Sequence, residues 1–167
     1  MRPDRVFTAF LVALIFAAAQ PASADQVTEQ ERGRIVERVL KHVNLQRAMN
    51  GAGQLTLNAR LADAAQKHAE DMSRRDFVDH RSPDGRGLQD RIAAAGYPWR
   101  VIAENLAAGL SSPERTVESW MTSPGHRDNM LDRDYLDAGI GYAVPSGEDK
   151  RPRYNHYWVV VFGARSR

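Results

Sequence analysis

The chain of 167 residues contains no cysteine, which excludes a disulfide framework and a thiol nucleophile. It also lacks an excess of either charge. Its formal net charge of +2 at pH 7 leaves no electrostatic footprint for nucleic acid. The motifs H-E-x-x-H, G-x-S-x-G and G-x-G-x-x-G and the P-loop do not occur either. These absences leave no familiar catalytic signature, while a hydrophobic content of 43% is adequate for one folded core.

The first 24 residues have the organisation of a secretory signal peptide. Arg2 and Arg5 precede the uncharged stretch 6–19, and Ala22-Ser23-Ala24 supplies an A-x-A cleavage site. The stretch is shorter than the roughly 20 residues that a membrane-spanning helix needs, and no cysteine follows it for lipid attachment. We therefore expect residues 1–24 to be removed. Residues 25–167 should then form a single exported domain, periplasmic or extracellular, without a membrane span.

Hydrophobic spacing and turn residues predict the elements of this domain. Helices are expected at 28–48, 58–75, 88–95 and 112–121, and strands at 101–106, 138–144 and 154–162. Thr28 and Glu31 form a capping-box pattern, and Ser82-Pro83-Asp84-Gly85 is typical of a turn.

The last predicted strand determines the layering. From Tyr157 to Phe162 both of its faces are apolar, so helices should cover it on both sides. In the strand before it, Gly139 and Gly141 share a face that allows close approach. The expected fold class is α/β, a three-layer α/β/α sandwich with a small, mainly antiparallel central sheet.

Histidines and one glutamate are the candidates for chemistry. His68 lies on the apolar stripe of the predicted helix 58–75, where a packed, hydrogen-bonded histidine is expected. His80 and His126 each adjoin turn-forming residues, and polar side chains on such loops commonly build sites. Glu104 falls on an apolar strand face, where a carboxylate needs a partner because its unpaired burial is costly. A protonated histidine or a metal ion could be the partner of the Glu104 carboxylate.

A metal site is one interpretation of these residues. Two histidines and a carboxylate can form an open zinc site, with His80 and His126 as ligands and water in the fourth position. The separations of His80, Glu104 and His126 match no short metal signature. Structural hydrogen bonding is therefore the competing interpretation, and a divalent metal such as Zn²⁺ is the only cofactor that the residues suggest.

Several segments, taken in chain order, resemble a known family. They include Phe77-Val78-Asp79-His80, Ala103-Glu104-Asn105-Leu106, Ser123-Pro124-Gly125-His126, Gly139-Ile140-Gly141-Tyr142 and Tyr157-Trp158. These segments look like the CAP superfamily, which contains the cysteine-rich secretory proteins, antigen five and plant pathogenesis-related proteins. The resemblance is closest to its bacterial SCP-like extracellular branch and spans about residues 35–163. It implies the same α/β/α sandwich and a central cleft lined by two histidines and two acids.

The family's cleft residues carry over unevenly. His80 matches the first family histidine, and Glu104 matches the glutamate of the G-E-N-[LI] motif, here A-E-N-L. The second acid falls on Ser123 and is absent, while His126 belongs to the bacterial S-P-G-H pattern and can fill that space. Alignment of the family's H-Y-[TN]-Q motif with the last strand puts Tyr157 at the second histidine. His156 is one residue away, on the opposite face.

The resemblance implies a ligand-binding or cell-envelope interaction module, because family members are similar to scaffolds that bind sterols, lipids or partner proteins. His80, Glu104 and His126 would form the floor of a polar cleft for a small-molecule, lipid or cell-wall ligand. The alternative is a metal-dependent hydrolase in which Glu104 or His126 acts as general base on a metal-bound water. The missing acid and the lack of a nucleophile motif favour the binding module over an enzyme.

Overall fold

The computed structural model describes residues 27–145 and 152–166, so the predicted signal peptide lies outside the described residues. Five helices and four strands follow one another in these ranges: α1 (Glu29–Met49), β1 (Thr56–Leu57), α2 (Ala59–Arg75), α3 (Leu88–Ala94), β2 (Trp99–Ala108), α4 (Pro113–Thr122), α5 (Pro124–Leu131), β3 (Asp137–Ala143) and β4 (Tyr157–Arg165). Within them, no helix is both long enough and apolar enough to cross a membrane.

The strands form one sheet in the order β1-β3-β4-β2. The short β1 pairs parallel with β3, while β3 with β4 and β4 with β2 pair antiparallel. The prediction of a small, mainly antiparallel sheet is confirmed. In the β2–β4 register Glu104 lies opposite Val161, and Ala108 lies opposite Tyr157.

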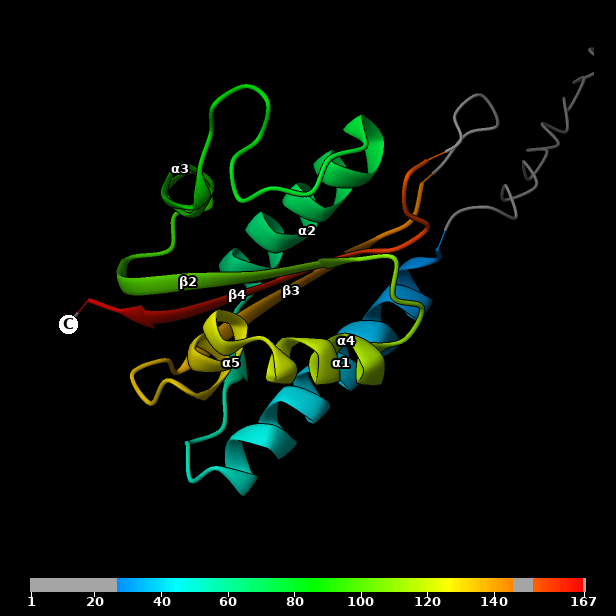
Figure 1. The fold of residues 1–167 in the computed structure, drawn as a ribbon. Coiled ribbons are helices and arrows are strands. Elements are labelled where there is room, and N and C mark those ends of the chain that lie inside the picture. Colours follow the sequence, from blue (N-terminus) through cyan, green and yellow to red (C-terminus); the bar gives the residue numbers. More distant parts are fainter. Residues whose placement is uncertain (1–26, 146–151, 167) are drawn as a thin grey trace, which may run out of the picture.

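Helices cover both faces of the sheet, as predicted. α2 and α3 lie on one side of it, and α1, α4 and α5 lie on the other (Figure 1). Residues of β4 alternate between two apolar cores. Trp158, Val160 and Phe162 pack in the core with α1 and α4, and Tyr157, Val159 and Val161 pack in the core with α2. The three-layer α/β/α sandwich follows from this double burial.

Two glycines set the distance between α2 and the sheet. A Cβ on Gly139 would lie 2.1 Å from the Leu61 carbonyl carbon, and one on Gly141 would lie 2.3 Å from the Ala65 carbonyl oxygen. The helix backbone therefore rests directly on β3, which confirms the close approach expected from this glycine pair. This packing fixes α2, and with it the loop that follows α2, against the sheet.

Local signals fixed several element ends, although two elements were missed. Thr28 and Glu31 form the predicted capping box, and the Gly85 N–H donates to the Ser82 carbonyl at 2.8 Å in the predicted turn. The two-residue β1 was not predicted. The segment around His126 was interpreted as a turn, and this was wrong. Pro124 begins α5, so His126 lies in the first turn of a helix.

Candidate functional site

Glu104 is the buried centre of the site. It lies in the middle of β2 on the face that packs against α2 and α3, and only 1% of its side chain is exposed. Arg91 of α3 neutralises its charge, because the Nη2 group lies 2.9 Å from Oε1 and 2.8 Å from Oε2. His80 Nδ1 lies 2.8 Å from Oε1 as well. One carboxylate thus joins a helix and a loop to the sheet.

Arg91 also positions His80, and sequence reasoning missed it. Its Nη1 group donates to the His80 carbonyl at 3.0 Å, so one guanidinium holds both the backbone of His80 and the carboxylate that binds its ring. Arg91 is almost fully buried. A signal was available in the sequence. Arg91 is three residues after Leu88 and beside Ile92, on the inward side of a short helix.

The His80 ring is held at one end and open at the other. Nδ1 faces Glu104, whereas 59% of the side chain is exposed, so Nε2 is the nitrogen that a ligand would meet. The hydrogen bond to Glu104 raises the pKa of His80, with burial acting in the opposite direction. Because a carboxylate accepts from Nδ1–H, the protonated ring is a donor at both nitrogens.

His126 forms the opposite wall of the site through a different anchor. Its carbonyl accepts a hydrogen bond of 2.9 Å from Nδ2 of Asn105, a fully buried side chain. Asn129 donates to Asn105 Oδ1 at 2.9 Å, which ties α5 to β2 at a second point. Sequence reasoning named the A-E-N-L segment but gave Asn105 no role. As neighbours on a strand, Glu104 and Asn105 point to opposite faces and anchor opposite walls.

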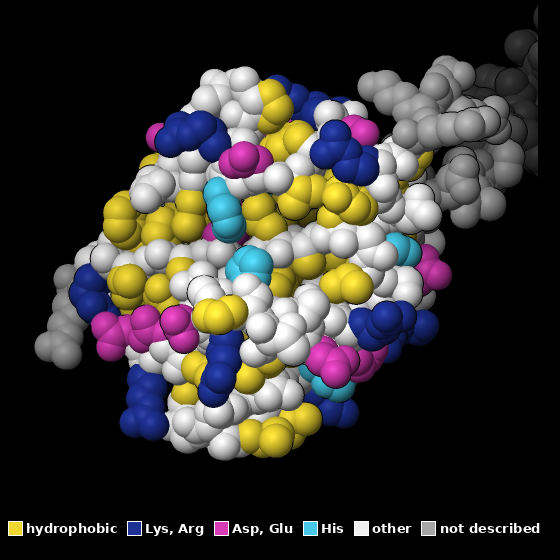
Figure 2. Space-filling view, in the orientation of Figure 1, with side chains coloured by type: hydrophobic (Ala, Val, Ile, Leu, Met, Phe, Trp, Pro, Cys, Tyr) yellow, Lys and Arg dark blue, Asp and Glu magenta, His cyan; other side chains and the backbone are white. Residues whose placement is uncertain are grey.

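His80 influences the charge state of His126 across the site. Burial lowers the pKa of His126, and the nearby His80 lowers it further. Two histidine side chains lie next to each other at the centre of one face of the molecule (Figure 2). The site therefore combines a histidine biased toward the charged form with one biased toward the neutral form.

The remaining expected residues lie elsewhere or have structural roles. Ser123 joins α4 to α5, and its carbonyl accepts from the Arg127 N–H at 2.8 Å. Tyr157 is on the same sheet face as Glu104 but about 13 Å along the strand, at roughly 3.3 Å per residue. Its hydroxyl donates to Asp76 at 2.8 Å, and burial raises its pKa to about 12.

His156 lies on the other face of the sheet. Its Nδ1 is 2.7 Å from the Tyr142 hydroxyl, and the two rings stack with centroids 6.0 Å apart. The structure thus brings together His80, Glu104 and His126, and does not bring Tyr157 or His156 to them.

The donor groups suit a metal only in part. Among the described residues, no group of three or more His, Cys, Asp or Glu side chains is arranged to hold a metal ion. Both Glu104 oxygens are bonded to Arg91, and Nδ1 of His80 is bonded to Glu104. A metal ion here would have two protein ligands, the free imidazole nitrogens of His80 and His126. Open zinc sites usually have three protein ligands.

Fold and site together define an α/β/α domain with His80, Glu104 and His126 gathered at the edge strand β2 of its sheet. The model of the CAP (cysteine-rich secretory protein) family matches residues 40–162, and the chain belongs to this family. It is 32% identical over 111 residues to Bacillus subtilis (strain 168) YkwD, which covers 66% of this chain and 43% of YkwD. It is also 30% identical over 105 residues to the membrane protein YlbC of the same organism. This match covers 63% of this chain and 30% of YlbC. The chain spans less than half the length of both relatives.

Solved structures share the fold. An extracellular SCP-domain protein from Bacillus anthracis str. Ames superposes with a TM-score of 0.72 at 24% identity, covering 89% of this chain and 45% of that one. An outer surface protein from Borrelia burgdorferi also gives a TM-score of 0.72, at 20% identity, covering 84% of this chain and 98% of that one. The family and fold expected from the sequence motifs are therefore confirmed.

Proposed function

We propose that the protein is an exported CAP-domain binding module whose His80–Glu104–His126 cleft receives the polar head of an envelope ligand. The observation that carries this proposal is the double engagement of Glu104 by Arg91 and His80, at 2.8–2.9 Å. The carboxylate is neutralised inside the protein, so the cleft offers imidazole groups to a ligand rather than a free carboxylate base.

The charges around the cleft favour an anionic or oxygen-rich ligand head. Arg91 and a protonated His80 together outweigh the single negative charge of Glu104, and the raised pKa of His80 favours its protonated form. Hydrogen bonds from a charged donor to an oxygen anion are stronger than neutral ones. A carboxylate or phosphate oxygen beside Nε2 of His80 would gain this interaction.

The surroundings favour an apolar portion next to that head. Hydrophobic side chains lie on both sides of the histidine pair on this face (Figure 2). Val78, close before His80, is 39% exposed, and Met121 at the end of α4 is half-buried. Apolar surface with a few convergent polar groups is typical of small-molecule sites. The ligand class is therefore an amphiphile, such as a lipid or a lipid-linked cell-wall component.

Two facts support export of the protein. Residues 1–24 have the organisation of a signal peptide. The structurally similar proteins include one described as extracellular and one described as an outer surface protein. An envelope ligand fits this location.

A metal-dependent hydrolase is the alternative from the sequence, and the geometry gives it less support. A general base must be free to accept a proton. Glu104 is bonded to Arg91 through both oxygens, and His126 with His80 offers two zinc ligands instead of three. The binding module is therefore the function that the geometry favours.

Calorimetric titration with decanoate tests the proposal, with decyltrimethylammonium as the amphiphile of opposite head charge. We expect decanoate to bind with one-to-one stoichiometry and the cation to bind at least roughly tenfold more weakly. His80→Gln should weaken decanoate binding by a similar factor, because the charged donor is lost. His42→Gln is the matched control, since His42 lies on α1 with Glu114 as its partner, and it should bind like the unmodified protein.

The same two variants, together with His126→Gln, separate binding from catalysis. Equal decanoate affinity in the unmodified protein, His80→Gln and His42→Gln would overturn the proposed cleft. Absence of binding in all of them would overturn it as well. Zinc-dependent turnover of a decanoate ester that is lost in both His80→Gln and His126→Gln would replace the binding module with the hydrolase.

A further inference from the structure

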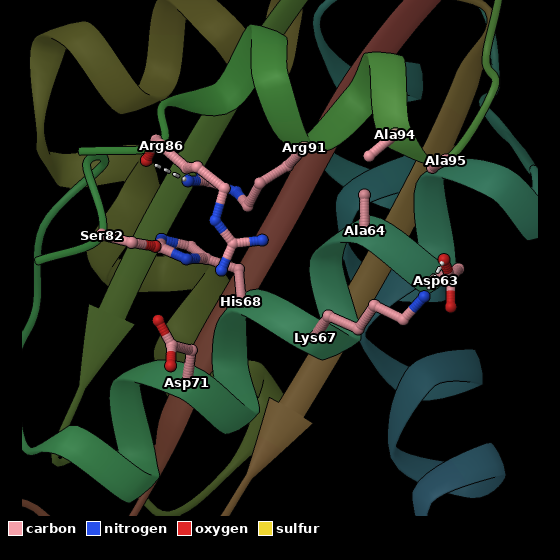
Figure 3. A pocket seen from close by; sticks show the side chains of 10 residues that line it. All are labelled: Asp63, Ala64, Lys67, His68, Asp71, Ser82, Arg86, Arg91, Ala94 and Ala95. Carbon is pink, nitrogen blue, oxygen red and sulfur yellow. Dashed lines mark hydrogen bonds and ion pairs between the residues drawn. The ribbon is translucent and has the colours of Figure 1, made fainter. Parts of the chain in front are cut away.

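A cavity of about 90 Å³ lies between α2, the loop that follows α2, and α3. Its charged and hydroxyl-bearing lining includes Asp63, Lys67 and Asp71 of α2, Ser82 and Arg86 of the loop, and Arg91 of α3. The side chains of Ser82, Arg86 and Arg91 converge on one space, whereas Lys67 points toward Asp63 (Figure 3). The proposed function uses Arg91 only as the partner of Glu104, so the rest of this cavity has no role in it.

The two carboxylates of the lining are already paired with cations. Asp63 Oδ2 accepts a hydrogen bond of 2.8 Å from Lys67 Nζ. Asp71 accepts hydrogen bonds from Arg74 and Arg75, and neither of these arginines belongs to the lining. The charge of Asp71 is therefore neutralised from outside the cavity, and its repulsion of an anion inside the cavity is reduced.

Three donor groups of the lining are not used within the described residues. Arg86 donates to Asp84 through Nε and Nη2, which leaves its Nη1 group. Arg91 donates to Glu104 through Nη2 and to backbone carbonyls through Nη1, which leaves its Nε group. The hydroxyl of Ser82 is the third. Unused donors of this kind favour a ligand that only accepts hydrogen bonds, and a negative charge on that ligand strengthens them.

A ligand can reach these donors although two of the residues are buried. Ser82 is 4% exposed and Arg91 is 8% exposed. Among the described residues that are not exposed, the side-chain polar atoms with neither a partner nor accessible surface are Arg32 Nε and His68 Nδ1. The unpaired Ser82 Oγ and Arg91 Nε are not in this group, so each of them keeps accessible surface. The Arg86 side chain is 61% exposed.

The backbone holds the three donor residues together. The Ser82 N–H donates to the Arg86 carbonyl at 2.9 Å and closes the turn of the loop. Arg91 Nη1 donates to the same carbonyl at 3.4 Å and to the His80 carbonyl at 3.0 Å. The Arg86 carbonyl is thus the common link of all three residues. A ligand meets donors that are already gathered, which lowers the entropy cost of binding.

The size of the cavity and its donors indicate a phosphate group. The volume exceeds the roughly 10–15 Å³ that one water needs and is smaller than the cavity of about 150 Å³ that holds benzene in an engineered protein. A phosphate group lies between these two sizes. Its oxygens point in several directions, which suits donors that come from the loop and from α3, and guanidinium groups bind it through charge-assisted hydrogen bonds.

We propose that this cavity is a binding site for a phosphate group, held by Arg86 Nη1, Arg91 Nε and the Ser82 hydroxyl. The group is either free inorganic phosphate or the end of a phosphate ester, because the exposed Ala94 in the lining leaves room for the rest of a larger molecule. The site shares Arg91 with the Glu104 pair. Ser82 and Arg86 belong to the cavity alone, and the tests therefore rest on these two residues.

Calorimetric titration of the protein with inorganic phosphate tests the site. A buffer with about 0.15 M sodium chloride and no other oxyanion screens unspecific attraction between exposed charges. We expect one-to-one binding that Arg86→Met weakens at least roughly tenfold, because a charged donor is lost. Arg100→Met is the matched control, since Arg100 is also an exposed arginine paired with one aspartate but lies outside the lining. It should bind phosphate like the unmodified protein.

A second variant keeps every charge and removes only the hydroxyl. Ser82→Ala should weaken phosphate binding roughly threefold, and thermal unfolding verifies that each variant is folded. Titration with glycerol 3-phosphate distinguishes the two sources of the group. Tighter binding of inorganic phosphate assigns the site to the free ion, tighter binding of glycerol 3-phosphate assigns it to an ester, and either result supports the site.

Three results would overturn the proposal. The first is the absence of saturable binding of either phosphate compound. The second is an equal loss of affinity in Arg86→Met and Arg100→Met, because the anion would then respond to surface charge in general. The third is phosphate binding that is lost in His80→Gln and kept in Arg86→Met, which would place the anion beside the histidines. None of these results depends on the decanoate titration, so the cavity and the proposed function fail separately.

Discussion

Two neighbouring residues of β2 hold the two sides of the candidate site by different means. Glu104 points toward α3 and holds His80 and Arg91 by charge, while Asn105 points toward α5 and holds the His126 carbonyl and Asn129 by amide hydrogen bonds. Both side chains are buried. A buried ion that loses its partner costs more than a buried amide that loses one. The ionic wall should therefore be the less tolerant of change, and the amide wall the more adjustable.

The largest effect should come from Arg91→Met, which leaves the Glu104 carboxylate buried without its main partner. We expect a loss of about 3–5 kcal/mol in unfolding free energy, measured by urea denaturation. Arg86→Met is the matched control, because Arg86 pairs with Asp84 at the surface and its loss should leave stability nearly unchanged. If both variants lost equally little, Glu104 would not depend on Arg91. A Glu104→Met, Arg91→Met double variant should recover part of the loss, since no charge is then buried.

A smaller effect is expected from Asn105→Ala, which unpairs neutral groups only. The loss should be about 1–3 kcal/mol, because the His126 carbonyl and the Asn129 amide lose their partner. Amide hydrogen exchange should become faster in α5 and stay unchanged in α3. Faster exchange in both helices would show that the two walls are not separately anchored.

The smallest effect is the pH dependence, and it should have opposite signs for the two histidines. The pKa of His80 is raised in the folded protein, so its stabilising effect is full below the unfolded value near 6.5 and disappears as pH rises through the folded pKa. The pKa of His126 is lowered, so its stabilising effect is present above 6.5 and is lost as pH falls through the folded pKa.

Comparison of unfolding free energies at pH 5 and pH 8 measures this difference. Relative to the unmodified protein, His80→Gln should lose more unfolding free energy at pH 5 than at pH 8. His126→Gln should lose more at pH 8 than at pH 5. Both differences should stay below about 1 kcal/mol, because the His80 side chain is 59% exposed and solvent screens its interaction. Equal losses of each variant at both pH values would contradict the opposed shifts.

The fold was largely predictable because its signals are local or periodic. The capping box at Thr28 and Glu31, the turn at 82–85 and the alternation along β4 each act over a few residues, and the structure confirms them. α5 was missed because its sequence has no apolar stripe and begins with turn-forming residues. Asn105 of β2 holds α5 against the sheet through the His126 carbonyl and the Asn129 side chain, and such tertiary hydrogen bonds leave no apolar stripe in the helix sequence.

The site was predictable in its residues and much less in its connections. The apolar strand face around Glu104 predicted that this carboxylate needs a partner, but it did not predict which residue. The structure shows that the partners are Arg91 and His80. Arg91 is 13 residues before Glu104 and reaches it through the packing of α3 against the sheet. Which carboxylate a long arginine side chain pairs with depends on tertiary geometry, and the spacing of residues along the chain does not reveal it. The same holds for His126, which is brought to His80 by α5.

The central claim is that one buried carboxylate raises the pKa of His80 while the pKa of the neighbouring His126 is lowered. A ¹⁵N NMR titration of the histidine rings in the unmodified protein tests it most directly. We predict that His80 titrates above 6.5 with Nδ1 protonated throughout, and that His126 titrates below 6.5. Two histidines that titrate together near 6.5, or in the reverse order, would contradict the account.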